Sequence, residues 1–289
     1  MELRPYQIEL INKIKLQLVN NKKSICCVLG CGGGKSVIQG CITANANKKG
    51  NRVLFLVHRK ELCEQIRNTF TLCGVDWNLT DVGMVQTYSR HIDKLKPPNI
   101  IITDECHLST ANSYIKIYKA FPDALKLGFT ATPIRLNRGG LGDVYDSLVT
   151  GVSTRWLIDN KFLADYKHYS VPVANTSELH TRSGDFVQSE VQELMENKNI
   201  YGDTVENWLR LAKGKKTLVY CSSVKSSTET AEHFKSRGIS AEHLDGNTSS
   251  ENRAEVMRQF RNNKIQVLCN CELFSVGLDV PDCLITSAL

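Results

Sequence analysis

Apolar and polar residues alternate along this chain in two recurring patterns. Short runs of apolar residues rich in β-branched side chains, such as Val53 to Val57 and Ile100 to Thr103, have the length and composition of buried strands. Segments between these runs carry apolar residues at helical spacing, as in residues 8–18. Such a rhythm of strand and helix is typical of a parallel sheet covered by helices on both faces. The sequence therefore predicts an α/β fold.

Two series of these elements follow one another, which predicts two domains. In the first series we expect strands at 25–29, 53–57, 82–86, 100–103 and 125–130, and helices at 8–18, from 35, from 58, at 113–120 and at 154–165. In the second series we expect strands at 166–173, 217–221, 241–244, 265–269 and 284–287, and helices at 186–211, 224–237 and 250–261. The predicted domains are residues 1–163 and 164–289, and this length suits two cores.

A glycine-rich stretch follows the first predicted strand. The strand ends in Gly30-Cys31-Gly32-Gly33-Gly34, and Lys35-Ser36 then opens a segment with helical spacing. This order is the setting of a phosphate-binding loop, in which glycines wrap the backbone around an anion and the helix N-terminus adds free N–H groups. We therefore expect Gly32, Gly33, Gly34, Lys35 and Ser36 to bind ATP, with the lysine on the β/γ-phosphates and the serine on Mg²⁺.

One residue departs from the strict pattern of such a loop. The pattern would place glycine at position 29, where this chain has Leu29. The alternative interpretation of the stretch is a glycine-rich turn followed by a lysine without a role in binding.

Two adjacent carboxylates, Asp104 and Glu105, end the apolar strand that begins at Ile100. Ligands of parallel sheets collect at the carboxyl ends of the strands, so this pair is expected at the same edge as the glycine-rich loop. We expect Asp104 to hold Mg²⁺ and Glu105 to orient the attacking water, because phosphoryl transfer asks a protein mainly for positioning and charge. The alternative is an acidic surface turn.

The composition, with 42% hydrophobic and 23% charged residues, is that of an ordinary globular protein. Its apolar runs are too short to cross a bilayer and its N-terminus lacks the core of a signal peptide, so we expect a cytoplasmic protein without a membrane partner.

The eleven cysteines show no C-x-x-C spacing, and we expect reduced thiols and no metal site built on them. A charge of +6 fits a polyanionic partner, although a solvated surface explains it as well. Phe129 and Trp77 are interpreted as core residues rather than base-stacking platforms.

Asp104-Glu105-Cys106-His107 resembles the DExH box of superfamily-two helicases, and Thr130-Ala131-Thr132 resembles the motif that couples the ATP state to nucleic acid in that family. Further motifs match in the family's order over essentially the whole chain. Their sequences are most similar to those of bacterial RadD-type and phage DEAD/DEAH-box helicases. The resemblance implies two tandem RecA-like domains, with ATP and Mg²⁺ bound at the cleft between them. It also implies coupling roles for Thr130 and Thr132.

The resemblance also assigns roles to residues outside the loop and the acidic pair. Arg4 and Gln7 resemble the adenine-reading motif, and Gly277 and Asp279 resemble a motif that contacts ATP at the cleft. His107 joins Lys35, Asp104 and Glu105 as a catalytic residue. Nucleic-acid contacts are expected from a set of residues spread over both domains: Arg59, Gln86, Thr87, Ser222 and Thr248. Polar residues after strands also form ordinary turns, which is the alternative for most of this set.

The function implied by the resemblance is that of an ATP-dependent helicase or translocase, acting as a monomer on DNA rather than RNA. Two alternatives stay open: an ATP-dependent clamp on nucleic acid that does not unwind it, and the motor part of a restriction or defence assembly. The family's last motif, a helix with arginine fingers, is expected after the strand at 284–287 and lies outside this sequence, so the second domain is expected to be incomplete. Because a finger is worth about 10³ to 10⁵ in rate, we expect this chain to bind ATP and Mg²⁺ but to hydrolyse ATP slowly.

Overall fold

The computed structural model divides into two compact units, Met1–Lys167 and His168–Leu289, and each is described by itself. The sequence placed the boundary slightly earlier, at 163. The residues that the structure describes are 2–58, 60–133, 140–167, 179–182, 185–187, 189–190, 200–271, 273, 280 and 283–288.

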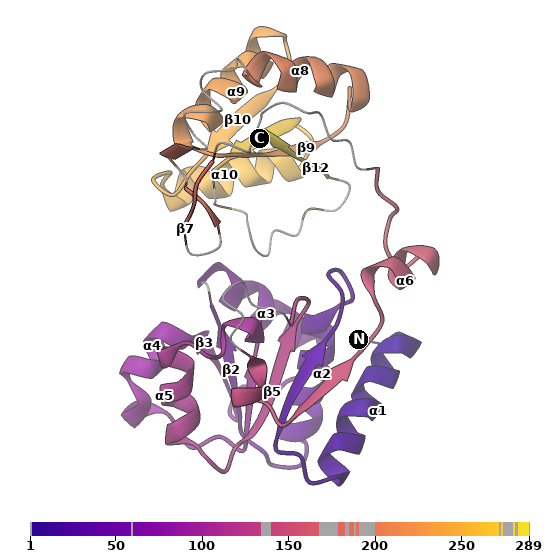
Figure 1. The fold of residues 1–289 in the computed structure, drawn as a ribbon, viewed down its shortest axis with the longest axis vertical. Helices are drawn as coiled ribbons and strands as arrows, with labels where there is room; N and C mark the ends of the chain where they lie inside the picture. The colour runs from indigo at the N-terminus through magenta and orange to yellow at the C-terminus, as the bar shows by residue number, and fades with distance from the viewer. Residues whose placement is uncertain are drawn as a thin grey trace. The chain divides into compact units, whose positions relative to one another are not determined.

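The first unit is built on a parallel sheet of six strands in the order β3-β2-β4-β5-β1-β6 (Figure 1). The strands are β1 (Ser24–Val28), β2 (Val53–Val57), β3 (Thr80–Met84), β4 (Ile100–Thr103), β5 (Leu125–Thr130) and β6 (Ser147–Thr150). Every pairing between neighbours is parallel, so all six carboxyl ends share one edge. β1 and β4 lie on either side of β5, which brings the ends of these two strands close together.

Helices cover both faces of this sheet, because successive strand residues point to opposite sides. Phe55 packs on one face with residues of α1 (Pro5–Val19), α2 (Lys35–Asn47) and α3 (Lys60–Leu72). Leu54 and Leu56 pack on the other face against α4 (Val85–Arg90) and α5 (Asn112–Ala120). Shorter elements complete the unit: η1 (Ile92–Lys94), η2 (Cys106–Leu108), η3 (Leu141–Asp143) and α6 (Thr154–Asp159).

The second unit repeats this plan on a smaller sheet with the order β10-β11-β9-β12, again all parallel. Its strands are β9 (Thr217–Cys221), β10 (Ala241–Leu244), β11 (Val267–Asn270) and β12 (Leu284–Ala288). Its helices are α8 (Ile200–Leu211) and α9 (Val224–Ser236) on one face and α10 (Ser250–Arg261) on the other. A short antiparallel pair, β7 (Thr181–Arg182) and β8 (Asp185–Phe186), precedes them.

The predicted α/β class and most predicted elements are confirmed, and the expected elements need several corrections. Strand β6 was not predicted. The helix expected at 154–165 ends at Asp159, where Asn160 caps it and Lys161 takes a positive φ of 63°. The strand expected at 82–86 lies at Thr80–Met84, and β11 begins at Val267 rather than 265.

A further correction concerns the stretch before α8. Residues 186–211 were expected to form one helix, but Phe186 belongs to β8, and α8 begins at Ile200. The strand expected at 166–173 lies mostly outside the described residues, and Tyr166 and Lys167 are not in a strand.

Among the described helices, none combines the length and the apolar character that a membrane span requires. The eleven cysteines all lie in the described ranges, and none of them forms a disulfide there. Over the described ranges, no group of three or more His, Cys, Asp or Glu side chains is placed to share a metal ion.

The core of the first unit makes a direct prediction for stability. Phe55 is fully buried and its ring meets Phe70 edge to face, with centroids 4.9 Å apart. We expect Phe55→Ala to lower the free energy of unfolding by about 3–5 kcal/mol, because the lost ring leaves a cavity. In urea unfolding followed by circular dichroism, Leu148→Ala on the exposed side of β6 is the control, and we expect it to cost no more than about 0.5 kcal/mol. Equal losses for the two variants would contradict this account of the core.

Candidate functional site

The glycine-rich loop joins the end of β1 to the start of α2, at the carboxyl edge of the sheet. Gly32 and Gly34 take φ values of 74° and 79°, in the left-handed region that favours glycine. Gly34 is also the N-cap of α2, and a Cβ added there would lie 2.5 Å from Gln7 Nε2. The loop therefore requires glycine at position 34 both for its backbone and for the space that Gln7 fills.

Helix α1 fixes this loop through its first turn. Tyr6 Oη and Gln7 Nε2 both donate to the carbonyl oxygen of Gly33, each at 3.1 Å. Gln7 Oε1 in turn accepts from the backbone N–H of Arg4 at 2.9 Å. The Arg4 guanidinium lies 5.1 Å from the centre of the Phe162 ring. The structure thus places Arg4 and Gln7 beside the loop, and their contact with adenine stays a prediction.

Leu29, the residue that departs from the strict motif, points away from the loop's outer surface. Its side chain is fully buried, and a Cβ on Gly33 would approach it to 2.8 Å. Its backbone N–H donates to the carbonyl of Thr130 at 3.0 Å. The leucine therefore fills the core beneath the loop, and the departure leaves the backbone cradle intact.

The acidic pair lies opposite Lys35. β4 ends at Thr103, and the turn that follows places Glu105 Oε1 3.4 Å from Lys35 Nζ. His107 Nδ1 lies 3.3 Å from the other carboxylate oxygen of Glu105. Glu105 has a φ of 47°, an unusual conformation for a residue with a side chain, and such strain is concentrated at functional sites. The structure thus brings Lys35, Glu105 and His107 together, as the sequence predicted.

A chain of hydrogen bonds links this cluster to the end of β5. His107 Nδ1 lies 3.1 Å from Thr130 Oγ1. The same hydroxyl accepts from the backbone N–H of Thr132 and donates to its carbonyl, both at 3.1 Å. Glu105 is therefore connected through His107 to both threonines that were assigned to coupling.

Asp104 occupies a more enclosed position than Glu105. Gln39 Nε2, from the second turn of α2, donates to Asp104 Oδ1 at 3.2 Å. Burial, with a smaller contribution from the negative charge of Glu105, raises the pKa of Asp104, while the Gln39 bond and the Lys35 ammonium oppose that rise. The carboxylate is thus held in a site that stabilises it incompletely.

Comparisons with known proteins agree with this arrangement. Residues 1–94 and 81–135 match the family described as Type III restriction enzyme, res subunit, and residues 201–286 match the helicase conserved C-terminal domain. A 51.5 kDa protein of a Lactococcus phage (isolate 7-9) is 43% identical over 255 residues, 88% of this chain and 56% of that protein. The putative ATP-dependent helicase IRC3 of Saccharomyces cerevisiae is 29% identical over 98% of this chain and 46% of that protein.

The chain belongs to the superfamily-two helicases. It spans about half the length of the curated relatives that it matches. The closer likeness to RadD-type helicases stays a prediction.

Two solved structures of other proteins show the same fold. The helicase domain of Pyrococcus furiosus Hef matches with a TM-score of 0.58 at 16% identity, over 100% of this chain and 91% of that one. The ATP-dependent Type ISP restriction-modification enzyme LlaBIII, bound to DNA, matches with a TM-score of 0.71 at 14% identity, over 100% of this chain and 25% of that one. The predicted pair of RecA-like domains is therefore confirmed as the fold.

A buried cluster of hydroxyl groups supports the turn that carries Asp104 and Glu105. Ser109 Oγ donates to the carbonyl of Cys106 at 2.6 Å and lies 2.9 Å from Tyr145 Oη. Tyr118 Oη lies 2.7 Å from Thr103 Oγ1 and 3.4 Å from Tyr145 Oη. These bonds satisfy polar groups that have no access to water, and they fix the backbone that carries Asp104 and Glu105.

Sequence reasoning missed several residues that shape the site, namely Tyr6, Gln39, Ser109, Tyr118 and Tyr145. Only one of them carried a usable signal. Gln39 lies four residues after Lys35, so helical spacing places both on one face of α2, and a buried glutamine there suggests a polar partner. Tyr6 becomes recognisable only when α1 packs beside the loop, and Ser109, Tyr118 and Tyr145 only when the sheet brings β4, α5 and the segment before β6 together.

The predicted nucleic-acid residues are not assembled by the described contacts. Gln86 and Thr87 lie in the first turn of α4, directly after β3. Ser222 follows β9 in the second unit, and Thr248 uses its hydroxyl and its N–H on Asp245 Oδ1, both at 2.8 Å. Three predicted site residues lie outside the described residues: Arg59, Gly277 and Asp279.

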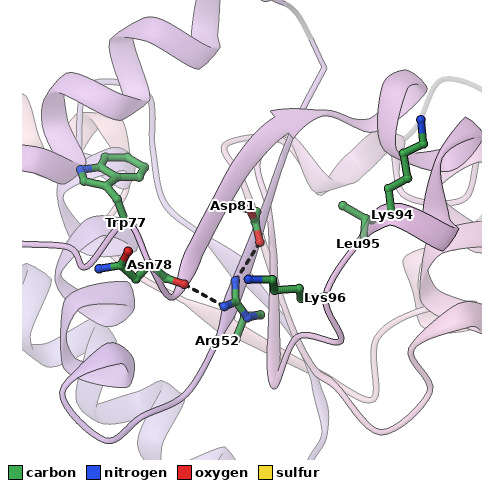
Figure 2. Close-up of a pocket in the computed structure, with 7 residues that line it drawn as sticks. All are labelled: Arg52, Trp77, Asn78, Asp81, Lys94, Leu95 and Lys96. Atoms are coloured by element: carbon green, nitrogen blue, oxygen red, sulfur yellow. Dashed lines mark hydrogen bonds and ion pairs between the residues drawn. The ribbon is translucent and has the colours of Figure 1, made fainter.

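A pocket of about 290 Å³ lies at the opposite edge of the first sheet, before the amino ends of β2, β3 and β4. Figure 2 shows Arg52 at its centre, paired with Asp81 at 3.1 Å and donating to the carbonyl of Asn78 at 2.7 Å. Trp77 lines it with 36% of its surface exposed, so the assignment of this residue to the core was wrong, whereas Phe129 is fully buried. Of the predicted site residues that the structure describes, none lines this pocket.

Because burial disfavours the charged form of Asp104, this carboxylate is expected to lower the free energy of unfolding at neutral pH. Folding raises the pKa of Asp104, so the folded chain holds the charged form less favourably than the unfolded chain does. We expect Asp104→Asn to raise the free energy of unfolding at neutral pH by about 1 kcal/mol. The gain should shrink as the pH falls through the folded pKa towards the ordinary value of 3.8.

Asp245→Asn is the control for this measurement, because its carboxylate is stabilised rather than strained. The Thr248 hydroxyl, in the first place, lowers the pKa of Asp245. Urea titrations at several pH values should therefore show the opposite sign for Asp245→Asn, a loss of stability at neutral pH. A loss for both variants would contradict the view that burial dominates at Asp104.

Proposed function

We propose that this chain binds ATP with Mg²⁺ on the loop at Gly32–Ser36, hydrolyses it, and uses the reaction to move along nucleic acid. The observation that carries the proposal is the approach of Lys35 Nζ to Glu105 at 3.4 Å, beside a loop of left-handed glycines. An ammonium, a cradle of backbone N–H groups and an acidic pair are the parts that phosphoryl transfer requires.

The residues at this edge fit a triphosphate and its metal. Gly34 has a φ of 79° and is the N-cap of α2, so the first N–H groups of this helix are available to bind an anion. Ser36 and Asp104 offer the oxygen atoms that Mg²⁺ prefers, and they would hold the ion. When bound, Mg²⁺ neutralises phosphate charge and orients the phosphates.

The roles of the remaining residues follow from their contacts. Lys35 pairs with Glu105 in the structure, and we propose that its ammonium turns to the β/γ-phosphates when nucleotide binds. Glu105 would then accept a hydrogen bond from the attacking water in the reaction ATP + H₂O → ADP + phosphate. His107 contacts both Glu105 and Thr130, so a rearrangement of Glu105 on nucleotide binding or hydrolysis would be coupled through His107 to Thr130 and Thr132.

We propose DNA as the nucleic acid, in line with LlaBIII, which was solved bound to DNA. A net charge of +6 suits a polyanion. Binding that falls mainly on phosphates would show little sequence preference and a steep dependence on salt. The monomeric state, the cytoplasmic location and slow hydrolysis by this chain stay predictions.

A second candidate function is the motor part of a restriction assembly. It is favoured by the match of residues 1–94 and 81–135 to the res subunit family, and by the likeness to LlaBIII. In this case the chain would translocate without separating strands by itself. The clamp that opens and closes on nucleic acid without moving is the third interpretation.

A lysine substitution tests the nucleotide site. We expect Lys35→Ala to lower kcat for ATP hydrolysis by roughly 10²-fold or more, because the charge aimed at the transferred phosphoryl group is lost. Lys13→Ala is the control, since Lys13 is exposed and its Nζ contacts Glu9 at 2.8 Å and the carbonyl of Thr150 at 3.4 Å, neither of which belongs to the proposed site. Phosphate release by the full chain, with and without single-stranded DNA, is the measurement. Wild-type rates in the Lys35→Ala chain would overturn the proposed site.

A strand-displacement assay with the same two variants separates the three functions. A helicase releases a labelled strand only with ATP, and loses this activity in Lys35→Ala. A translocating motor instead shows DNA-stimulated hydrolysis and displaces a triplex-forming strand without opening the duplex. A clamp shows ATP-dependent binding with neither kind of displacement, and this result would overturn the motor.

A further inference from the structure

The amide of Gln39 occupies a position that the proposed reaction does not yet explain. Gln39 lies one turn after Lys35 on α2 and is fully buried. Its Nε2 donates to Asp104 Oδ1 at 3.2 Å, while its Oε1 is buried and has no hydrogen-bond partner among the described residues. A buried amide oxygen without a hydrogen-bond donor destabilises the folded protein. Its place beside an acidic residue therefore needs an explanation.

The orientation of this amide is fixed by its neighbour. A carboxylate can only accept hydrogen bonds, so a flipped amide would place two oxygens against each other. Nε2 must therefore face Asp104, and Oε1 is left as an acceptor next to the carboxylate. Thr43 Oγ1 donates to the backbone carbonyl of Gln39 at 2.8 Å, a bond within α2 that does not involve the Gln39 amide.

We propose that Gln39 is a positioning residue for the metal that accompanies the nucleotide. Its Nε2 holds one oxygen of Asp104 and so leaves the other carboxylate oxygen for Mg²⁺. Its Oε1 would be the acceptor for a water molecule of the hydrated ion, since Mg²⁺ keeps several waters in nucleotide sites. This inference rests on the proposed function, because it needs a nucleotide with its metal at this loop.

A purely structural role for Gln39 leads to a different expectation. The bond between Gln39 and Asp104 also ties α2 to the end of β4, and a tie of this kind contributes only to stability. Loss of a tie would weaken nucleotide binding equally with and without Mg²⁺. Loss of a positioning residue would remove the part of the affinity that depends on Mg²⁺.

The test uses Gln39→Met in the full chain, because methionine keeps the length and unbranched shape of glutamine and removes both amide atoms. Thr43→Val is the matched control: it is fully buried on the same helix, one turn further on, and it loses a hydroxyl at nearly constant shape. The affinity for a fluorescent ADP analogue is measured by titration in Mg²⁺ and in EDTA, and thermal unfolding is recorded for each variant.

We expect wild type and Thr43→Val to bind the analogue more tightly in Mg²⁺ than in EDTA, by the same ratio. In Gln39→Met this ratio should fall roughly 10-fold, the usual effect of losing a residue that orients a metal ligand. Affinity in EDTA should stay within about twofold of wild type, since the phosphate contacts of the loop are unchanged.

The possible outcomes separate this inference from the proposed function. A wild-type ratio in Gln39→Met overturns the inference alone. An equal fall of the ratio in Thr43→Val overturns it too, because packing would then explain the effect. A wild-type chain that binds no analogue in either buffer overturns the proposed function together with the inference.

Discussion

The close approach of the Lys35 ammonium to the Glu105 carboxylate depends on nearly every other feature of the first unit. Lys35 begins a helix whose start is set by Gly34, and Glu105 follows a strand two places away in the sheet. The parallel register of β1, β5 and β4 brings the two ends to one edge. The hydrophobic faces of the strands and helices maintain this register, so the residues of the core also determine the geometry of the site.

The site is held at some cost to stability. Glu105 adopts a left-handed backbone conformation, and burial raises the pKa of Asp104 beside it. Features of this kind persist only where the surroundings determine them, and here the hydroxyl cluster around Ser109 and Tyr145 and the amide of Gln39 supply that support. The amide oxygen of Gln39 has no hydrogen-bond partner among the described residues, and burial disfavours the charged form of Asp104. This pattern is expected of groups whose partner is a bound ion.

Much of this architecture could be predicted from the sequence, because the signals were local. Buried strands such as β2 and β4 appear as short apolar runs, and the glycine-rich loop and the acidic pair are motifs of adjacent residues. Strand β6 was missed because it is an edge strand of four residues, of which only Val149 is buried. The early end of α6 depends on a positive φ at Lys161, which no glycine marks. Gln39 and Tyr6 act across the fold, and only the three-dimensional structure shows their partners.

The affinity of a Gly34→Ala chain for ADP in Mg²⁺ tests most directly the claim that a fixed backbone cradle binds the nucleotide. Gly74→Ala is the matched control, because Gly74 has nearly the same φ, 76° against 79°, but a Cβ there meets nothing within 4 Å. Both variants carry backbone strain of about 1–2 kcal/mol, but only the Cβ at position 34 displaces Gln7. We expect Gly34→Ala to bind ADP at least roughly tenfold more weakly than wild type does, and Gly74→Ala to bind it with wild-type affinity. Equal affinities for the two variants would contradict it.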